Sequence, residues 1–113
     1  MRLRIALLLA VMAAGPAGAH AILERASPPV GGVVSRPPAE IRLWFSERIE
    51  PRFSRARLAT AAGTTVAAGS AVSGKQLVLH VPPLAPGSYR VTWSVVSVDT
   101  HKTEGSFTFE VRP

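Results

Sequence analysis

Proline and glycine interrupt this chain so often after residue 20 that a long helix has no room to form. The interruptions are Pro28-Pro29, Gly31-Gly32, Pro37-Pro38, Pro51, Gly63, Gly69, Gly74, Pro82-Pro83, Pro86-Gly87 and Gly105. Between them lie short runs rich in β-branched and aromatic residues, which are typical of strands. The sequence therefore predicts an all-β domain.

Apolar residues alternate with polar ones along several of these runs, and a period of two places them on one face of a strand. The expected strands are residues 41–46, 56–60, 65–68, 75–81, 88–98 and 106–111. We expect Trp44, Tyr89 and Trp93 to serve the core or its rim. About seven short strands in one small domain favour a single antiparallel β-sandwich of the immunoglobulin-like, Greek-key type.

The first 19 residues follow a different pattern. A positively charged start precedes an unbroken apolar run at residues 5–14, and Ala17-Gly18-Ala19 closes the segment. This order is typical of a secretory signal peptide, and the apolar run is too short to span a bilayer core of about 30 Å. We expect cleavage after residue 19, which would leave residues 20–113 as one exported domain that does not span the membrane. The alternative is an uncleaved membrane anchor.

Charge and sulfur content exclude several functions. The formal net charge is +6, but the arginines are scattered and form no run that could follow a phosphate backbone, so we expect no nucleic-acid partner. The chain has no cysteine, and its two methionines, Met1 and Met12, both lie in the leader. Thiolate nucleophiles and zinc-thiolate sites are therefore excluded.

Cleavage after residue 19 would make His20 the first residue of the domain. A free α-amine releases its proton more readily than a lysine side chain does, and it can close a chelate ring with Nδ1 of the same residue. Cu(II) prefers such tetragonal nitrogen and oxygen ligands. The alternative is that the peptidase leaves a histidine there by chance.

A second candidate ligand group is Asp99-Thr100-His101. The carboxylate and the imidazole are two residues apart, so they project to the same side of an extended segment, at a strand end or loop where sites commonly lie. Ordinary turn chemistry is the competing interpretation. His80 lies on the less apolar face of a strand and is expected to be a surface residue.

Three stretches carry a family resemblance: "SPPVGG" at 27–32, "LWFSERIE" at 43–50 and "LAPGSYRVTWSVVSVDTHKTEGSFTFEV" at 84–111. Together with the histidine at the processing site, they resemble the CopC-type copper-binding family over nearly all of residues 20–113. The resemblance implies a periplasmic β-sandwich that binds one Cu(II) per monomer through His20, Asp99 and His101. It also implies that Glu47 lies outside the set of residues that bind the ion directly. The partner that it implies is an inner-membrane copper transporter of the CopD type.

Two departures from the family pattern bear on the site. Thr100 stands where the motif has glycine, and because threonine resists a positive φ, we expect the loop to bend differently. Lys102 stands where proline is often found. The processed domain also lacks methionine, so the methionine-rich Cu(I) site of some family members is absent.

The sequence thus predicts an exported Cu(II)-binding protein for copper homeostasis or resistance, and not an enzyme. Cleavage would create a ligand, because it turns the peptide nitrogen of His20 into an amine. One alternative is an oxidative enzyme with a copper brace, although Asp99 would fill an open position and the small domain leaves little room for a substrate platform. The other is a metal-free immunoglobulin-like interaction module.

Overall fold

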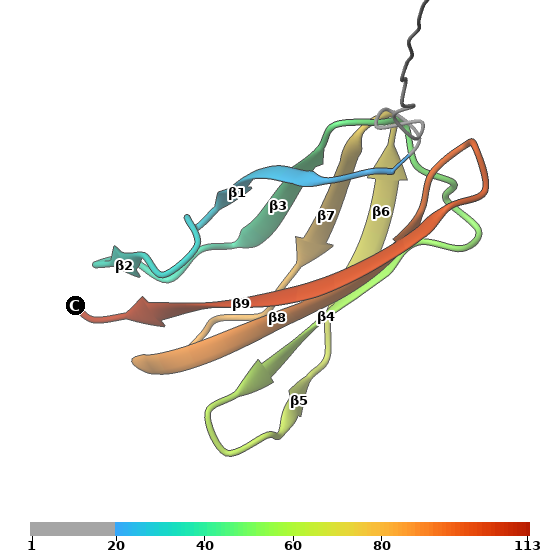
Figure 1. Cartoon of the computed structure of the whole chain (residues 1–113). Coiled ribbons are helices and arrows are strands. Elements are labelled where there is room, and N and C mark those ends of the chain that lie inside the picture. The colour runs from blue at the N-terminus through green and yellow to red at the C-terminus, as the bar shows by residue number, and fades with distance from the viewer. Residues whose placement is uncertain (1–19) are drawn as a thin grey trace, which may run out of the picture.

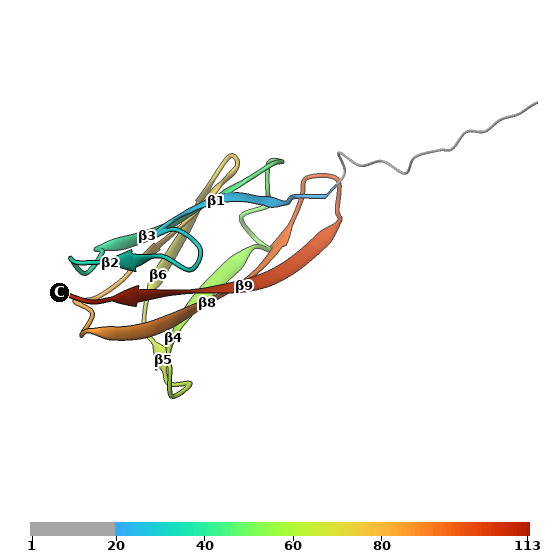
Figure 2. The same cartoon turned by 60° about the vertical axis from the view of Figure 1, so that its left-hand side comes forward.

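A computed structural model of the chain describes residues 20–113, and the expected signal peptide at residues 1–19 lies outside the described residues. In the described part, nine strands form two sheets that face one another (Figure 1). Figure 2 shows the two layers from a second direction, with β1 (Leu23–Ser27) and β3 (Glu40–Phe45) in one and β8 (Gly87–Val96) and β9 (Lys102–Val111) in the other. The expected all-β sandwich is confirmed.

Each sheet combines strands that are distant in sequence. The four-stranded sheet has the order β1 (Leu23–Ser27), β3 (Glu40–Phe45), β7 (Gln76–His80) and β6 (Gly69–Ser73). The five-stranded sheet has the order β2 (Val33–Val34), β9 (Lys102–Val111), β8 (Gly87–Val96), β4 (Arg55–Thr60) and β5 (Thr65–Val66). All neighbours pair antiparallel except β2 and β9, which are parallel. Residues 20–113 hold no helix with the length and apolar character needed to cross a membrane.

The core follows the alternation in the sequence. On β8, Tyr89, Trp93 and Val95 face inward, and Phe107 and Phe109 do so on β9. Trp93 meets Phe45 of the opposite sheet edge to face, with ring centroids 5.2 Å apart. The ring of Tyr89 stacks on Phe109, and its hydroxyl donates a 2.6 Å hydrogen bond to the carbonyl of Ala85. The Trp93–Phe45 contact therefore joins β8 to β3 across the core, whereas Tyr89 and Phe109 pack within the five-stranded sheet.

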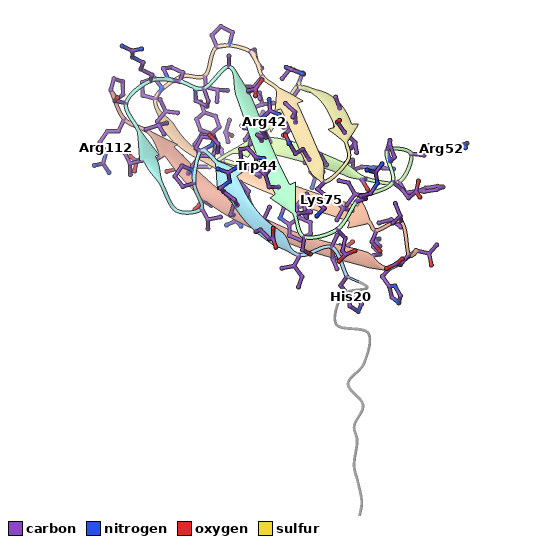
Figure 3. The ribbon with its side chains drawn as sticks, turned by 90° about the horizontal axis from the view of Figure 1, so that it is seen from above. His20, Arg42, Trp44, Arg52, Lys75 and Arg112 are labelled. Atoms are coloured by element: carbon purple, nitrogen blue, oxygen red, sulfur yellow. The ribbon has the colours of Figure 1, made fainter. Side chains whose placement is uncertain are left out.

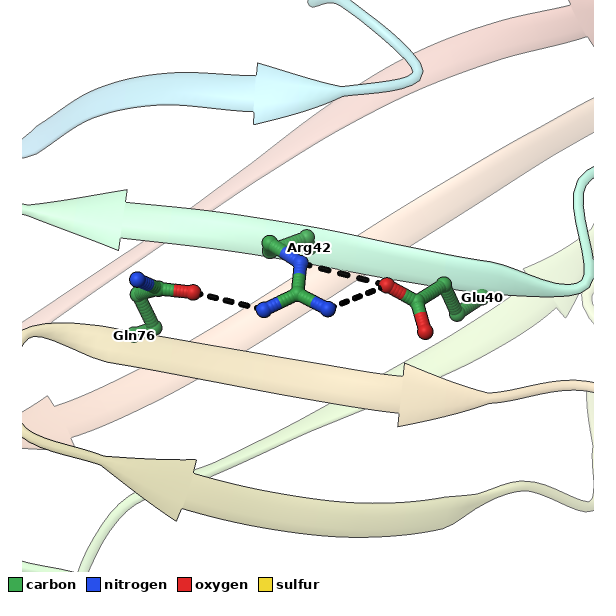
Figure 4. Close-up of polar contacts among 3 residues, drawn as sticks. All are labelled: Glu40, Arg42 and Gln76. Atoms are coloured by element: carbon green, nitrogen blue, oxygen red, sulfur yellow. Dashed lines mark hydrogen bonds and ion pairs between the residues drawn. The ribbon is translucent and has the colours of Figure 1, made fainter.

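Trp44 lies outside this core, on the outer face of the four-stranded sheet. It is half-buried, and the guanidinium of Arg25 lies 3.8 Å from its ring centroid. Arg42 reaches along the same face to Glu40 and Gln76, with its Nη1 donating to the Gln76 side chain at 2.6 Å (Figure 4). The guanidinium groups of Arg25 and Arg42 therefore cover the Trp44 ring on the outer face of the sheet, where it does not contribute to the core.

Candidate metal centre

Two histidines from distant parts of the sequence meet at one end of the sandwich. His101 lies in the loop that joins β8 to β9, and His20 lies just before β1. Their ring centroids are 4.8 Å apart, with an interplanar angle of 63°, and both residues are exposed. Figure 3 shows His20 and Arg112 at different ends of the domain. The pair is thus accessible to an ion from solvent.

Hydroxyl groups from both sheets hold the backbone around His20. Ser46, directly after β3, accepts a 2.8 Å hydrogen bond from the Ile22 N–H and donates one of 3.2 Å to the His20 carbonyl. Thr103 of β9 donates a 2.7 Å bond to the carbonyl of Ala21, whose side chain is fully buried. The residues next to His20 are therefore fixed to both layers.

The loop that carries His101 closes on Ser97, which is fully buried. The Ser97 N–H donates to the His101 carbonyl at 2.9 Å, and the Thr100 N–H donates to the Ser97 carbonyl at 2.8 Å. The N–H of His101 donates in turn to Oγ of Ser97 at 3.3 Å. These bonds make the end of the hairpin a defined turn, as the polar sequence of residues 99–105 indicates.

The expectation that threonine at position 100 would avoid a positive φ is wrong. Thr100 takes a φ of 71°, in the left-handed region that glycine adopts easily. Its N–H is bound to Ser97, and its hydroxyl donates to the carbonyl of Asp99. The surrounding hydrogen bonds therefore impose a backbone conformation that the side chain resists.

Replacing Thr100 by glycine should stabilise the metal-free domain. The left-handed conformation costs a residue with a Cβ about 1–2 kcal/mol, and glycine loses about 0.5–1 kcal/mol of that through its greater freedom when unfolded. We expect a gain of about 0.5–1 kcal/mol in urea unfolding. Thr64→Gly is the matched control, because this loop threonine has no positive φ and should lose stability. A lower unfolding free energy in Thr100→Gly than in the wild type would contradict backbone strain at this turn.

Asp99, His80 and Glu47 are the remaining residues that the sequence analysis singled out. Asp99 is exposed in the His101 loop, but no three His, Cys, Asp or Glu side chains within residues 20–113 gather closely enough to hold a metal. His80 is exposed, and its backbone lies opposite Glu40 in the ladder between β7 and β3. Glu40 is at the start of β3, whereas Ser46, which contacts His20, follows the end of that strand. Glu47 is half-buried and directly follows Ser46.

Sequence reasoning missed the three hydroxyl residues Ser46, Ser97 and Thr103. Each acts on a residue that is brought near by folding or by the turn, and no spacing in the sequence signals such contacts. The side-chain donors that the structure brings together are two imidazoles. An α-amine on His20 would exist only if the chain were cleaved before this residue.

Fold and site together define a two-sheet β-sandwich that presents a histidine pair, His20 and His101, at one end. The CopC domain model matches residues 23–112. Protein YobA from Escherichia coli strain K12 is 35% identical over 117 residues, which cover 99% of this chain and 94% of that protein. The chain therefore belongs to the CopC family.

Solved structures agree with this assignment. The crystal structure of CopC from Methylosinus trichosporium OB3b superposes with a TM-score of 0.80 and 34% identity, over 83% of this chain and 95% of that one. PcoC, described as a methionine-rich copper resistance protein from Escherichia coli, superposes with a TM-score of 0.77 and 35% identity, over 83% and 100% of the two chains. Members of the family thus include copper resistance proteins.

Proposed function

We propose that the processed chain, beginning at His20, is a periplasmic protein that binds one Cu(II) per monomer for copper homeostasis or resistance. The observation that carries this proposal is the 4.8 Å separation of the His20 and His101 rings. Two imidazoles and an amine form the nitrogen-rich donor set that Cu(II) prefers. The residues present therefore fit the ion.

Each residue has a distinct role in this proposal. His20 supplies the α-amine and Nδ1, and His101 supplies an imidazole nitrogen. Asp99 has the lesser role of an oxygen ligand or of an acceptor that orients an imidazole. Delivery to an inner-membrane transporter of the CopD type is the further step that we propose, because the exposed pair can pass its ion to a partner.

Native mass spectrometry of the exported protein with added Cu(II) tests the proposal. We expect a mass that begins at His20 and one copper ion per chain. The control is the same domain with its α-amine acetylated, which keeps both imidazoles but removes the amine lone pair from the chelate, and which should bind copper less tightly. A different first residue, or no bound copper, would contradict the proposal. Reductant-dependent peroxide production would instead favour an oxidative enzyme.

The proposed site should bind Cu(II) much more tightly than Cu(I). Its donors are nitrogen and oxygen, whereas Cu(I) favours thiolate and thioether, and residues 20–113 contain neither cysteine nor methionine. Binding should also weaken in acid, since protons compete for the amine and the imidazoles. Separate competition titrations with a Cu(I) chelator and a Cu(II) chelator measure the two affinities. Comparable values would show that the site is not the one described.

A further inference from the structure

The first residue of a processed domain is commonly poorly ordered, because nothing precedes it in the chain to hold it. Here the residues around His20 are fixed to both sheets by side-chain hydroxyls. We propose that Ser46 and Thr103 form a clamp that holds His20 beside His101 before copper binds, and that these two hydroxyls set the affinity of the site. The inference rests on the proposed function for its ligand.

Ser46 acts on both sides of Ala21. A hydroxyl has one hydrogen to donate and two lone pairs to accept, and Ser46 uses it to accept from the Ile22 N–H at 2.8 Å and to donate to the His20 carbonyl at 3.2 Å. The N–H of Ser46 also donates to the Ile22 carbonyl at 2.8 Å. These bonds fix the direction of the backbone as it reaches His20.

Thr103 links the two histidine-bearing segments directly. It lies two residues after His101, at the start of β9, and its hydroxyl donates to the Ala21 carbonyl at 2.7 Å. Ala21 is fully buried, so this carbonyl has little freedom to move away. The hydrogen bond from Thr103 to Ala21 therefore helps to set the distance between the His20 and His101 rings.

The two hydroxyls bind only backbone groups that cleavage would leave unchanged. These are the carbonyls of His20 and Ala21 and the N–H of Ile22. His20 is therefore already in position when its amine is released. A ligand that is held in place before binding loses less entropy when the ion arrives, and this raises affinity without a new contact to the ion.

Removing either hydroxyl should weaken copper binding in the processed protein. A hydrogen bond contributes about 0.5–1.5 kcal/mol, so we expect Ser46→Ala and Thr103→Val each to weaken Cu(II) binding about threefold to tenfold. Ser46→Thr and Thr103→Ser keep the hydroxyls and should restore most of the affinity. The matched controls are Ser73→Ala and Thr108→Val, exposed positions in β6 and β9, which should leave affinity unchanged.

A second measurement needs no metal. Amide hydrogen exchange at Ile22 in the copper-free protein should be faster in Ser46→Ala than in the wild type, because the amide loses its acceptor. In a His20→Ala background, Ser46→Ala should no longer change copper affinity, since the clamp has no ligand left to position. A purely structural role would lower the unfolding midpoint in both backgrounds and leave affinity alone.

The outcomes separate this inference from the proposed function. If Ser46→Ala and Thr103→Val fold and bind Cu(II) as the wild type does while His101→Ala binds weakly, the clamp is wrong and the copper site stands. If His101→Ala also binds as the wild type does, the proposed function itself is wrong. Should Ser46→Ala fail to fold, Thr103→Val alone decides the clamp.

Discussion

Replacing His101 by alanine in the processed protein is expected to weaken Cu(II) binding by more than about a hundredfold. Loss of a group that merely orients a ligand commonly costs 10–100-fold in metal affinity, so loss of a ligand should exceed that range. The structure brings the imidazole of His101 to His20, with ring centroids 4.8 Å apart, and in our proposal it supplies the second ring nitrogen. Competition titration against a Cu(II) chelator measures the loss.

A histidine elsewhere in the domain provides the matched control. His80 is exposed at the end of β7, away from Ser46, and His80→Ala should leave the affinity as it is. Asp99→Ala should cause a smaller loss than His101→Ala, because we propose Asp99 only as a weaker oxygen ligand or as an acceptor that orients an imidazole. Equal affinity in His101→Ala and the wild type would remove His101 from the site.

The fold could be predicted where the alternation of apolar residues was strong. The runs that became β3, β4, β7 and β8 begin and end within about two residues of the structure, since one buried face fixes each strand. The short strands β1, β2 and β6 were missed. The sequences of β1 and β6, "LERAS" and "GSAVS", carry few apolar residues, and the two valines of β2 are too few to show an alternation. These segments form strands because β3, β7 and β9 offer edges to pair with.

Strand ends were hardest to predict, because they depend on pairing. β9 begins at Lys102, well before the expected residue 106, since Lys102 pairs with Val96 of β8. Residues 102–105 are polar or glycine and show no alternation of apolar residues, so the sequence does not indicate that the strand begins at Lys102. The hairpin with β8 thus extends the ladder to the residue next to His101.

The histidine pair could be predicted because each histidine stands out by its own position in the sequence. A histidine after the expected cleavage point and a second one in a polar loop were considered together as candidate copper ligands, and the structure places their rings 4.8 Å apart. The positions of Ser46 and Thr103 could not, since their hydrogen bonds to residues 20–22 cross from one end of the sequence to the other. The φ of Thr100 was expected wrongly because the local preference of threonine gives way to the bonds that close the turn.

Replacing Trp93 by alanine should cost the domain about 3–5 kcal/mol of unfolding free energy, the range for truncating a large buried aromatic. Trp93 is 9% exposed, lies edge to face with Phe45, and covers Gly105 on the neighbouring strand. A single domain has only about 5–15 kcal/mol in total, so the variant should unfold at a much lower urea concentration. Trp44→Ala, on the outer face, should lose less.

Gly105→Ala tests the same packing from the other side. A Cβ at this position would lie 2.5 Å from Cζ2 of Trp93, so the indole would have to shift within a full core. Overpacking of this kind costs about 1–3 kcal/mol. In Trp93→Ala the added methyl group would meet a cavity instead, and Gly105→Ala should then cost much less than it does in the wild type. If Trp93→Ala proved as stable as the wild type, or if the two changes were simply additive, the indole could not lie over Gly105 and the pairing of β8 with β9 would have to be redrawn.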